Sequence, residues 1–421
     1  MEALPLAGVR VADLTMVWAG PFCTQILASL GAEVIKVESV KRFDSVRGSK
    51  HPREGTSGYP DDDPGADPWN RTVRFNERNR NKLAITLDLT EPAGIALFKQ
   101  LVAVSDVIIE NYSARVMEKL GLGYEVIASL RPDLVMLSMP GFGKTGPDSG
   151  SVAFGITIEA MAGLASLTGY GDGWPMKGGV NTGDPIAGLH AAGAILAALH
   201  YRAETGIGQF IDLSQQESAI CLTGETILDH AMNGRTPEPA ANRDRAKVPQ
   251  GCYPCSGDDH WIALSVHTEQ MWQALCDVID QPELVHDPRF SEAHRRWQHH
   301  DELDVIIAAW TRQQDPYRAL RCLQGASIPA GIAFANRDLF ADPHVLARQA
   351  LMLIDHPSAG LRVYPSSPLR LSAVASQRQR PAPRLGEHNS EVLGGLLGLQ
   401  DEELGMLRQR EIIGTVPLVE W

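Results

Sequence analysis

The sequence predicts an α/β protein with a mainly parallel sheet in a large domain and a second, smaller α+β domain. Two observations carry this prediction. Short apolar runs alternate with helical periodicity over residues 9–139, and a polar, Pro-rich stretch separates a further series of elements beyond residue 250. The length of 421 residues is enough for about two or three domains.

The first forty residues have the pattern strand, turn, helix, strand. Residues 9–13 form an apolar strand, Ala19-Gly20-Pro21 interrupts it, residues 22–30 have helical periodicity, and residues 33–37 form the next strand. Glu38 then occupies the position at which a dinucleotide-binding fold keeps its ribose acid. Because the turn lacks Gly-x-Gly-x-x-Gly, the sequence argues against a nicotinamide-dependent oxidoreductase.

The same alternation continues after a polar loop at residues 42–81. We expect strands at 83–87, 106–110, 134–139 and 210–213, and helices at 92–104, up to 120, 188–201 and 216–232. We expect four parts in the chain: 1–232 as the first part of the large domain, 233–250 as a linker, 251–330 as the small α+β domain, and 331–421 as a return linker and the C-terminal part of the large domain.

Composition limits the classes of partner. The formal net charge is -13, with 51 acidic and 38 basic side chains, which argues against a nucleic-acid surface. Six scattered cysteines form no disulfide framework, no leader pattern opens the chain, and the longest apolar stretch, 189–199, is too short to span a bilayer, so we expect a cytoplasmic protein with no membrane contact. Cys252-x-x-Cys255 lacks a second ligand pair, so no metal site is expected.

Asp184 is the strongest candidate for chemistry. It lies in the glycine-rich run 178–185, directly before the apolar helix, and the pattern predicts Asp184 at the N-cap with Pro185 at the first helical position. A plain helix cap is the structural alternative. Because the glycines allow close approach of a ligand and a helix N-terminus stabilises an oxyanion, a nucleophilic carboxylate is the functional interpretation.

Nine short motifs occur in order along the chain, among them Asn79-Arg80-Asn81-Lys82 and Gly183-Asp184. They occupy residues 5–15, 19–21, 30–38, 79–82, 110–112, 120–124, 141–143, 183–184 and 383–388. In this order and spacing they resemble the class III CoA-transferases, the family of formyl-CoA and carnitine-CoA transferases and of α-methylacyl-CoA racemases. The resemblance extends from end to end, and it implies a Rossmann-like large domain and an interlocked homodimer.

The resemblance also implies a mechanism. Asp184 matches the family's nucleophilic aspartate, which attacks an acyl-CoA thioester to give a mixed anhydride and a CoA thiolate. The thiolate returns to the aspartyl carbonyl, and an incoming carboxylic acid then takes the CoA. A carboxylate is needed because an anhydride keeps the acyl group reactive, and water has to be excluded. CoA is a substrate in this scheme, and no metal or redox cofactor is implied.

Carried over by position, the resemblance implies a set of CoA-binding residues. The thioester end is lined by Val17, Trp18 and Ala19; the adenine end is surrounded by Leu87, Thr90, Asn111 and Tyr112, with Lys119 near a phosphate. The structural alternatives are that Leu87 and Tyr112 are core residues and that Lys119 is a solvated surface charge. Asn111 and Tyr112 follow a strand of the predicted parallel sheet, where such sheets bind ligands.

Departures from the family pattern bear on the reaction. The racemases place a histidine base where this chain has Phe154, with Gly155 beside it, and neither side chain moves a proton. His190 and Glu159 are the substitutes available nearby, so racemisation is disfavoured but stays open as an alternative. A subunit of a heteromeric CoA-transferase is the second alternative, against which the intact Gly183-Asp184 argues.

The acyl pocket predicted from these positions consists of Trp18, Phe22 and Phe154, together with Trp174. Such a pocket is too large and apolar for formate or oxalate. We therefore expect a larger organic acid as acceptor, aromatic or a substituted dicarboxylate, with succinyl-CoA or a similar ester as donor. An unchanged preference among acids in Trp18→Gln would refute this argument.

Overall fold

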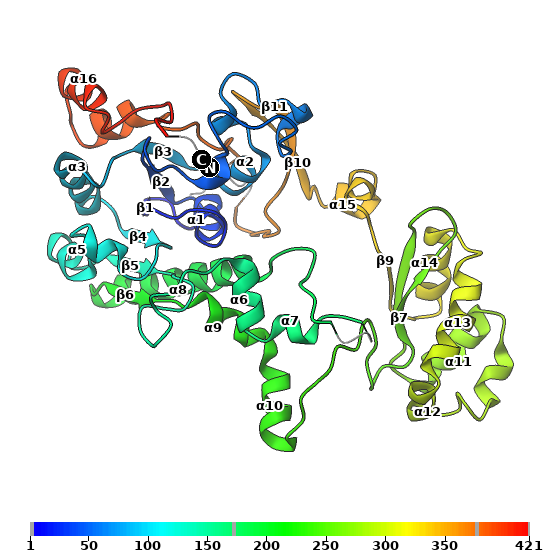
Figure 1. The fold of residues 1–421 in the computed structure, drawn as a ribbon. Coiled ribbons are helices and arrows are strands. Elements are labelled where there is room, and N and C mark those ends of the chain that lie inside the picture. Colours follow the sequence, from blue (N-terminus) through cyan, green and yellow to red (C-terminus); the bar gives the residue numbers. More distant parts are fainter. Residues whose placement is uncertain (1–3, 171–173, 375–378, 420–421) are drawn as a thin grey trace. The chain divides into compact units, whose positions relative to one another are not determined.

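The computed structural model describes residues 4–170, 174–374 and 379–419 (Figure 1). The chain divides into two compact units. The larger unit contains Met1–Ala165, Lys177–Thr236 and Ala350–Trp421, and the smaller contains Ser166–Met176 and Pro237–Gln349.

A six-stranded, fully parallel sheet forms the centre of the larger unit. Its strands have the order β3-β2-β1-β4-β5-β6. They are β1 (Arg10–Asp13), β2 (Glu33–Glu38), β3 (Leu83–Thr86), β4 (Val107–Glu110), β5 (Val135–Ser138) and β6 (Gln209–Asp212). The predicted parallel sheet is confirmed. The order reverses between β1 and β4, which is the switch point at which open α/β sheets bind ligands.

Alternate residues of each strand pack on opposite layers of helices (Figure 1). On one face Val11 and Ile109 pack against α1 (Ala19–Ser29) and α8 (Gly183–Thr205). On the other face Ala12 and Ile108 pack against α3 (Pro92–Ala103), α5 (Tyr124–Leu130) and α16 (Asp401–Gln409). Because both faces are covered, the strands have continuous apolar runs, as expected for a buried parallel sheet.

Small residues let α1 and α8 approach closely at the end where both helices begin. A Cβ built on Gly188 of α8 would lie 2.6 Å from the Ala19 carbonyl oxygen and 3.1 Å from Phe22 Cδ1. Backbone of one helix therefore touches backbone of the other, and the two N-termini are brought together at the carboxyl edge of the sheet.

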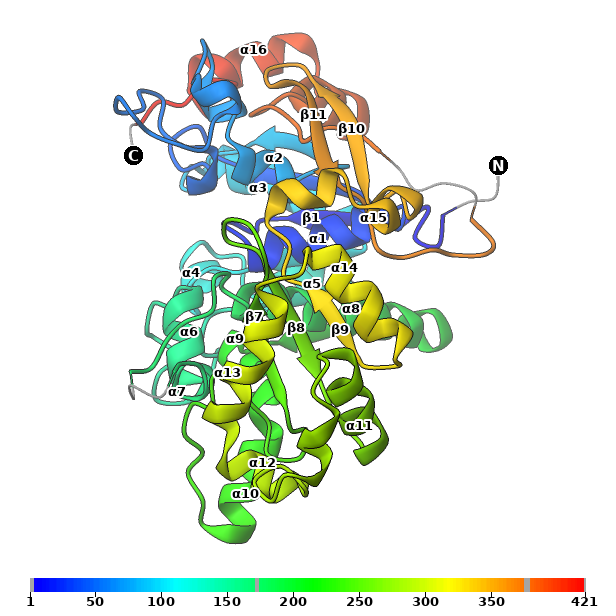
Figure 2. The same cartoon turned by 90° about the vertical axis from the view of Figure 1, so that its right-hand side faces the viewer.

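The remaining elements of the larger unit are short. They are η1 (Ser45–Arg47), η2 (Pro60–Asp62), η3 (Pro68–Asn70), α2 (Val73–Arg78), α4 (Val116–Lys119), α6 (Gly155–Met161), α9 (Gln215–Ile220), η4 (Cys221–Thr223), α10 (Gly224–Asn233), β10 (Leu351–His356), β11 (Gly360–Pro365) and η7 (Ser390–Leu396); α7 (Leu164–Leu167) lies at the unit boundary. The predicted single helix over 216–232 is wrong, because η4 divides it into α9 and α10. Strands β10 and β11 form an antiparallel hairpin, seen in Figure 2, that the sequence pattern did not indicate.

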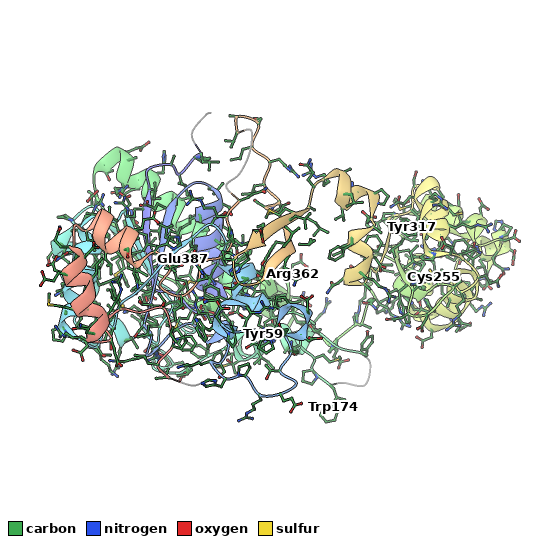
Figure 3. All side chains as sticks on the ribbon, turned by 90° about the horizontal axis from the view of Figure 1, so that it is seen from above. Tyr59, Trp174, Cys255, Tyr317, Arg362 and Glu387 are labelled. Atoms are coloured by element: carbon green, nitrogen blue, oxygen red, sulfur yellow. The ribbon has the colours of Figure 1, made fainter. Side chains whose placement is uncertain are left out.

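The smaller unit is α+β, as predicted. Its antiparallel sheet contains β7 (Gln250–Pro254), β8 (Trp261–Ser265) and β9 (Ala330–Ile332). Its helices are α11 (Glu269–Val278), η5 (Pro282–His286), α12 (Ala293–Gln298), α13 (His300–Thr311), α14 (Pro316–Gly325), η6 (Asn336–Phe340) and α15 (Pro343–Ala347). Cys255, labelled in Figure 3, lies in its apolar core, and burial raises the pKa of the Cys252 and Cys255 thiols.

Within the ranges that the structure describes, no cluster of three or more His, Cys, Asp or Glu side chains has metal-binding geometry. Within the same ranges, no helix combines the length and apolar character needed to cross a membrane.

Candidate active site

The candidate site is built on the loop that follows β1, at the switch point of the sheet. Asn111, directly after β4, reaches across to this loop: its Oδ1 accepts from the Met16 N–H and its Nδ2 donates to the Met16 carbonyl, both at 2.8 Å. The Asn111 amide thus makes the two hydrogen bonds to Met16 that the backbone of a neighbouring strand would make, at the point where β1 and β4 have ended. The structure therefore assigns the half-buried Asn111 a direct role in fixing the β1–α1 loop.

Val17 in this loop has a left-handed backbone with φ of 70°. Such a conformation is a genuine outlier for a β-branched residue and costs of order 1–3 kcal/mol. Two contacts hold it: the Val17 N–H donates to Asp44 Oδ1 at 3.0 Å, and its carbonyl accepts from an Arg78 Nη at 3.2 Å. Backbone strain at this point turns the chain from β1 into the N-terminus of α1.

Six fully buried charged side chains support the loop from beneath. They pair as Asp13–Lys82 at 3.0 Å, Asp44–Lys36 at 3.1 Å and Glu38–Arg47 at 2.8 Å. Burial alone would raise the pKa of Asp13, but Lys82 and Lys36 outweigh it and hold the pKa below its ordinary value. At Lys82, by contrast, burial outweighs the attraction of Asp13 and lowers the pKa to about 8. Because Arg47 occupies the Glu38 carboxylate, Glu38 is not available to a ribose, which agrees with the missing glycine motif.

Asp184 is not the N-cap of α8, contrary to the prediction. The helix begins at Gly183, its N-cap is Thr182, and Asp184 is the second helical residue. The cap is supplied from another helix: Glu159 of α6 accepts from the Thr182 N–H, from Thr182 Oγ1 at 2.9 Å and from the Gly183 N–H at 3.4 Å. Since Glu159 satisfies these donors, the Asp184 carboxylate is not needed to cap the N-terminus of α8.

The Asp184 side chain is instead enclosed by two other helix starts. Its carboxylate lies beside the backbone N–H of Ala19, the first residue of α1, and this N–H acts to lower its pKa. A Cβ built on Gly155, the first residue of α6, would lie 2.2 Å from Asp184 Oδ2, so bare backbone packs against this oxygen. Only 9 % of Asp184 is exposed. Any side chain at position 155 would displace the carboxylate.

This enclosure changes the acidity of Asp184. Burial raises the pKa of its carboxyl to about 6 from an ordinary 3.8; Arg78 opposes the rise, the charge of Glu159 adds to it, and the Ala19 N–H opposes it. A poorly solvated carboxylate that ionises just below neutral pH is a better nucleophile than a fully hydrated one. The arrangement therefore favours attack on a carbonyl over mere helix capping.

Some of the residues predicted for the thioester end and for the acyl pocket lie near Asp184. Ala19 contacts it directly, the half-buried Trp18 precedes Ala19 in the same loop, and Phe22 lies half-buried against Gly188, one turn beyond Asp184 on α8. Phe154 adjoins Gly155, but its side chain is 64 % exposed. Trp174 belongs to the smaller unit and is 73 % exposed (Figure 3).

The residues predicted for the adenine end differ in burial. Leu87 is 1 % exposed and lies in the sheet core, on which the half-buried Tyr112 also packs, so the core interpretation holds for the Leu87 side chain. Thr90 is exposed and donates through Oγ1 to Asp88 at 2.6 Å. Lys119 is exposed at the end of α4. These residues would present a ligand with backbone and surface groups rather than a closed pocket.

The two substitutes for a racemase base do not face Asp184 as bases. His190 is exposed on α8, with Nδ1 within 3.1 Å of the Ile186 carbonyl oxygen of its own helix. Glu159 is engaged as the α8 cap. Position 155 is a glycine in contact with the carboxylate. Of the two candidate bases, one is therefore exposed on its own helix and the other accepts hydrogen bonds from the start of α8.

Sequence reasoning missed one cation of the site. Arg78 ends α2, its guanidinium lies 4.1 Å from the centre of the Trp18 ring, and its charge acts on Asp184. The residue directly precedes the Asn79-Arg80-Asn81-Lys82 motif, but nothing in that spacing shows that its side chain reaches the β1–α1 loop.

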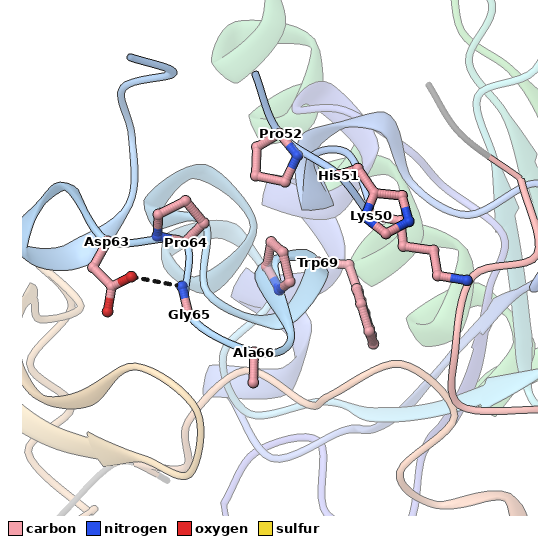
Figure 4. Close-up of a pocket in the computed structure, with 9 residues that line it drawn as sticks. Lys50, His51, Pro52, Asp63, Pro64, Gly65, Ala66 and Trp69 are labelled. Carbon is pink, nitrogen blue, oxygen red and sulfur yellow. Dashed lines mark hydrogen bonds between the residues drawn. The ribbon is translucent and has the colours of Figure 1, made fainter. Parts of the chain in front are cut away.

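A pocket of about 460 Å³ opens elsewhere on the larger unit (Figure 4). Its lining residues are Lys50, His51, Pro52, Asp63, Pro64, Gly65, Ala66, Pro68 and Trp69. All lie in the polar loop that the sequence predicted, and none is a candidate residue for the acyl or CoA sites. The geometry around Asp184, rather than this pocket, points to covalent chemistry.

Comparisons with known proteins place this Rossmann-type sheet in a family. The model of the CoA-transferase family III matches residues 6–389, and the chain belongs to this family of enzymes. It is 35 % identical over 97 % of its length to succinyl-CoA–D-citramalate CoA-transferase of Chloroflexus aurantiacus, covering 98 % of that protein. It is 32 % identical to the β subunit of succinyl-CoA–L-malate CoA-transferase of the same organism, over 97 % and 98 % of the two chains.

Among solved structures, a CaiB/BaiF family protein from Brucella suis superimposes with a TM-score of 0.83 at 30 % identity. The match covers 94 % of this chain and 100 % of the other. The fold expected from the family resemblance is therefore confirmed, and the protein is a CoA-transferase.

Proposed function

We propose that this enzyme transfers CoA from succinyl-CoA to a short dicarboxylic acid, with Asp184 as the nucleophile. The observation that carries the proposal is the enclosed Asp184 carboxylate, which contacts the α1 N-terminus and bare backbone at Gly155. The relatives named for citramalate and malate, both dicarboxylic acids, support the substrate class.

The reaction balances through Asp184 alone. Its carboxylate attacks the thioester carbonyl, the C–S bond breaks, and CoA leaves as a thiolate beside a mixed anhydride. The thiolate attacks the aspartyl carbonyl and releases succinate, leaving an aspartyl-CoA thioester. The acceptor carboxylate then displaces the thiolate from Asp184 and forms a second anhydride. Attack of the thiolate on the acceptor carbonyl gives the new CoA ester and restores Asp184.

The chain's own groups assist these steps by position. The Ala19 N–H at the start of α1 is placed to stabilise negative charge on oxygens bound to Asp184. Val17, Trp18 and Ala19 form the adjoining wall for the thioester, held by Asn111 and Asp44. We propose that CoA enters as a substrate and that no metal or redox cofactor takes part.

The wall at Trp18 favours a dicarboxylic over an aromatic acceptor. Arg78 covers one face of the Trp18 ring at 4.1 Å, so this side of the acyl pocket is cationic as well as apolar. An aromatic acid would compete with the guanidinium for the indole face, whereas a second carboxylate would be attracted to it.

We further propose that the working enzyme is a homodimer. Large apolar side chains are exposed on α10, where Leu228 is 61 % and Met232 78 % exposed, and on the β10–β11 hairpin, where Leu353 is 63 % and Leu361 58 % exposed. Such surfaces are typical of interfaces. Because the malate relative is a β subunit, a heteromeric enzyme is the alternative. The native mass and the activity of the chain purified alone separate the two.

The function is tested by incubating the enzyme in D2O with succinyl-CoA, a 2-methylacyl-CoA and a panel of free dicarboxylic, aromatic and monocarboxylic acids, followed by mass spectrometry. New CoA esters that require a free dicarboxylic acid are expected. Deuterium at the α-carbon without exchange of CoA would make the enzyme a racemase and refute the proposal. Esters of aromatic or monocarboxylic acids alone would refute the substrate class.

A further inference from the structure

Arg78 is held inside the site by two contacts with the β1–α1 loop. Its guanidinium stacks on Trp18 at 4.1 Å, and one Nη donates to the Val17 carbonyl at 3.2 Å. Its side chain is 15 % exposed. An arginine fixed in this way loses little conformational freedom when it binds a ligand.

Most of its hydrogen-bonding capacity is not used by the protein. A guanidinium carries five N–H donors, and within the described ranges the structure gives one hydrogen bond from them, to the Val17 carbonyl. The Glu77 carboxylate lies 3.7 Å from Arg78 Nε, beyond hydrogen-bonding distance. By contrast, the three fully buried cations beneath the loop each pair with a carboxylate at 2.8–3.1 Å. A half-buried cation with spare donors is suited to an anion from outside.

The free donors lie within electrostatic range of the reacting carboxylate. Burial lowers the pKa of Arg78, the charges of Glu77 and Asp184 oppose this, and Arg78 in turn opposes the raised pKa of Asp184. Within the described part of the chain the two side chains interact without forming a direct ion pair. A short molecule with a carboxyl group at each end can therefore react with Asp184 at one end while the other end meets Arg78.

We infer that Arg78 is a specificity-determining residue, which binds the distal carboxylate of the acyl group and so selects short dicarboxylic over monocarboxylic acids. This inference rests on the proposed function, because it assumes acyl transfer at Asp184. The planar guanidinium matches a carboxylate in a bidentate geometry, while Trp18 keeps it in place from behind. Charge at the far end of the substrate, rather than pocket size, then sets the preference.

The test uses the first half-reaction, which needs no acceptor. Succinyl-CoA and butyryl-CoA have acyl chains of four carbons and differ in the distal carboxylate. The rate of aspartyl-CoA thioester formation is measured for each by mass spectrometry of the intact protein. Wild-type enzyme is expected to prefer succinyl-CoA by about 100-fold, the loss typical of an unmade charge-assisted hydrogen bond. In Arg78→Leu the ratio of the succinyl-CoA rate to the butyryl-CoA rate should fall to about one, whatever the loss of Arg78 does to the rate that both esters share.

Two variants complete the design. Arg78→Lys keeps the charge but not the fork, and should retain part of the preference. Arg74→Leu, an exposed arginine on the same helix α2, should behave as wild type. An unchanged ratio of the two rates in Arg78→Leu overturns the inference. If both rates fall equally, Arg78 acts on Asp184, and if neither rate falls, Arg78 contacts no substrate. Failure of wild-type enzyme to form any thioester would refute the proposed function itself.

Discussion

The enclosed Asp184 predicts that the enzyme gains stability when its nucleophile is neutralised. Asp184→Asn keeps the shape of the side chain and one acceptor oxygen, but removes the charge. Because the folded pKa of about 6 lies above the ordinary 3.8, ionisation opposes folding. The cost is absent below the unfolded pKa and complete above the folded one.

The magnitude follows from the size of the rise. A pKa raised by about 2 corresponds to about 3 kcal/mol at pH 8 and about half of that at pH 5. We therefore expect Asp184→Asn to be more stable than wild type by up to about 3 kcal/mol at pH 8, with the gain shrinking as the pH falls. The same variant should be unable to form the aspartyl-CoA thioester, since it has no carboxylate nucleophile.

The assay is chemical denaturation of both proteins at pH 5 and pH 8, following the transition of the larger unit, together with mass spectrometry for the thioester. A helix cap behaves in the opposite way, because its loss costs about 1 kcal/mol at both pH values. If Asp184→Asn is less stable than wild type at pH 8, Asp184 stabilises the fold as a helix cap would, and the argument that Glu159 alone caps α8 is refuted.

Two further predictions concern the groups around Asp184. Gly155→Ala should lower kcat at least about 100-fold with the fold intact, because its Cβ would lie 2.2 Å from Asp184 Oδ2 and push the carboxylate aside. The measurement is steady-state kinetics. The matched control is Gly193→Ala, whose Cβ meets nothing within 4 Å. The value of kcat/KM should rise with pH through about 6 as Asp184 ionises. Glu159→Gln should move this rise to lower pH, because it removes a charge that raises the pKa of Asp184. A pH profile of kcat/KM that does not move in this variant would contradict the prediction.

Local patterns predicted the parallel sheet because strands β1 to β5 are almost entirely buried and therefore form clear apolar runs. The prediction failed where burial is incomplete. None of the residues of α10 is buried, so no core-facing period marked its separation from α9. In the β10–β11 hairpin, apolar residues lie on both faces. Leu353 and Leu361 are exposed while Ile354 is buried, so the apolar pattern does not mark the inward face. Where apolar residues are exposed, their positions in the sequence do not show which face of a helix or strand points inward.

In the site, neighbouring residues in the sequence were informative, whereas contacts between distant segments were not. Asp184 could be found from its neighbouring glycines, but the helix start was misplaced because its cap comes from Glu159, on a different helix. The clamp on Met16 comes from a residue 95 positions away. Arg78 reaches Val17 and Trp18 from the far side of a long polar loop. Contacts between segments so distant in sequence leave no periodic mark in a single chain.

The three ion pairs beneath the β1–α1 loop have a consequence for how this family can diverge. Their formal charges sum to zero, and each partner is fully buried. Replacing one member would leave an uncompensated charge at a cost of about 3–5 kcal/mol, a large part of a typical protein's stability. Lineages that change this foundation are therefore expected to replace both members of a pair together, whereas the residues facing the substrate are free to change one at a time.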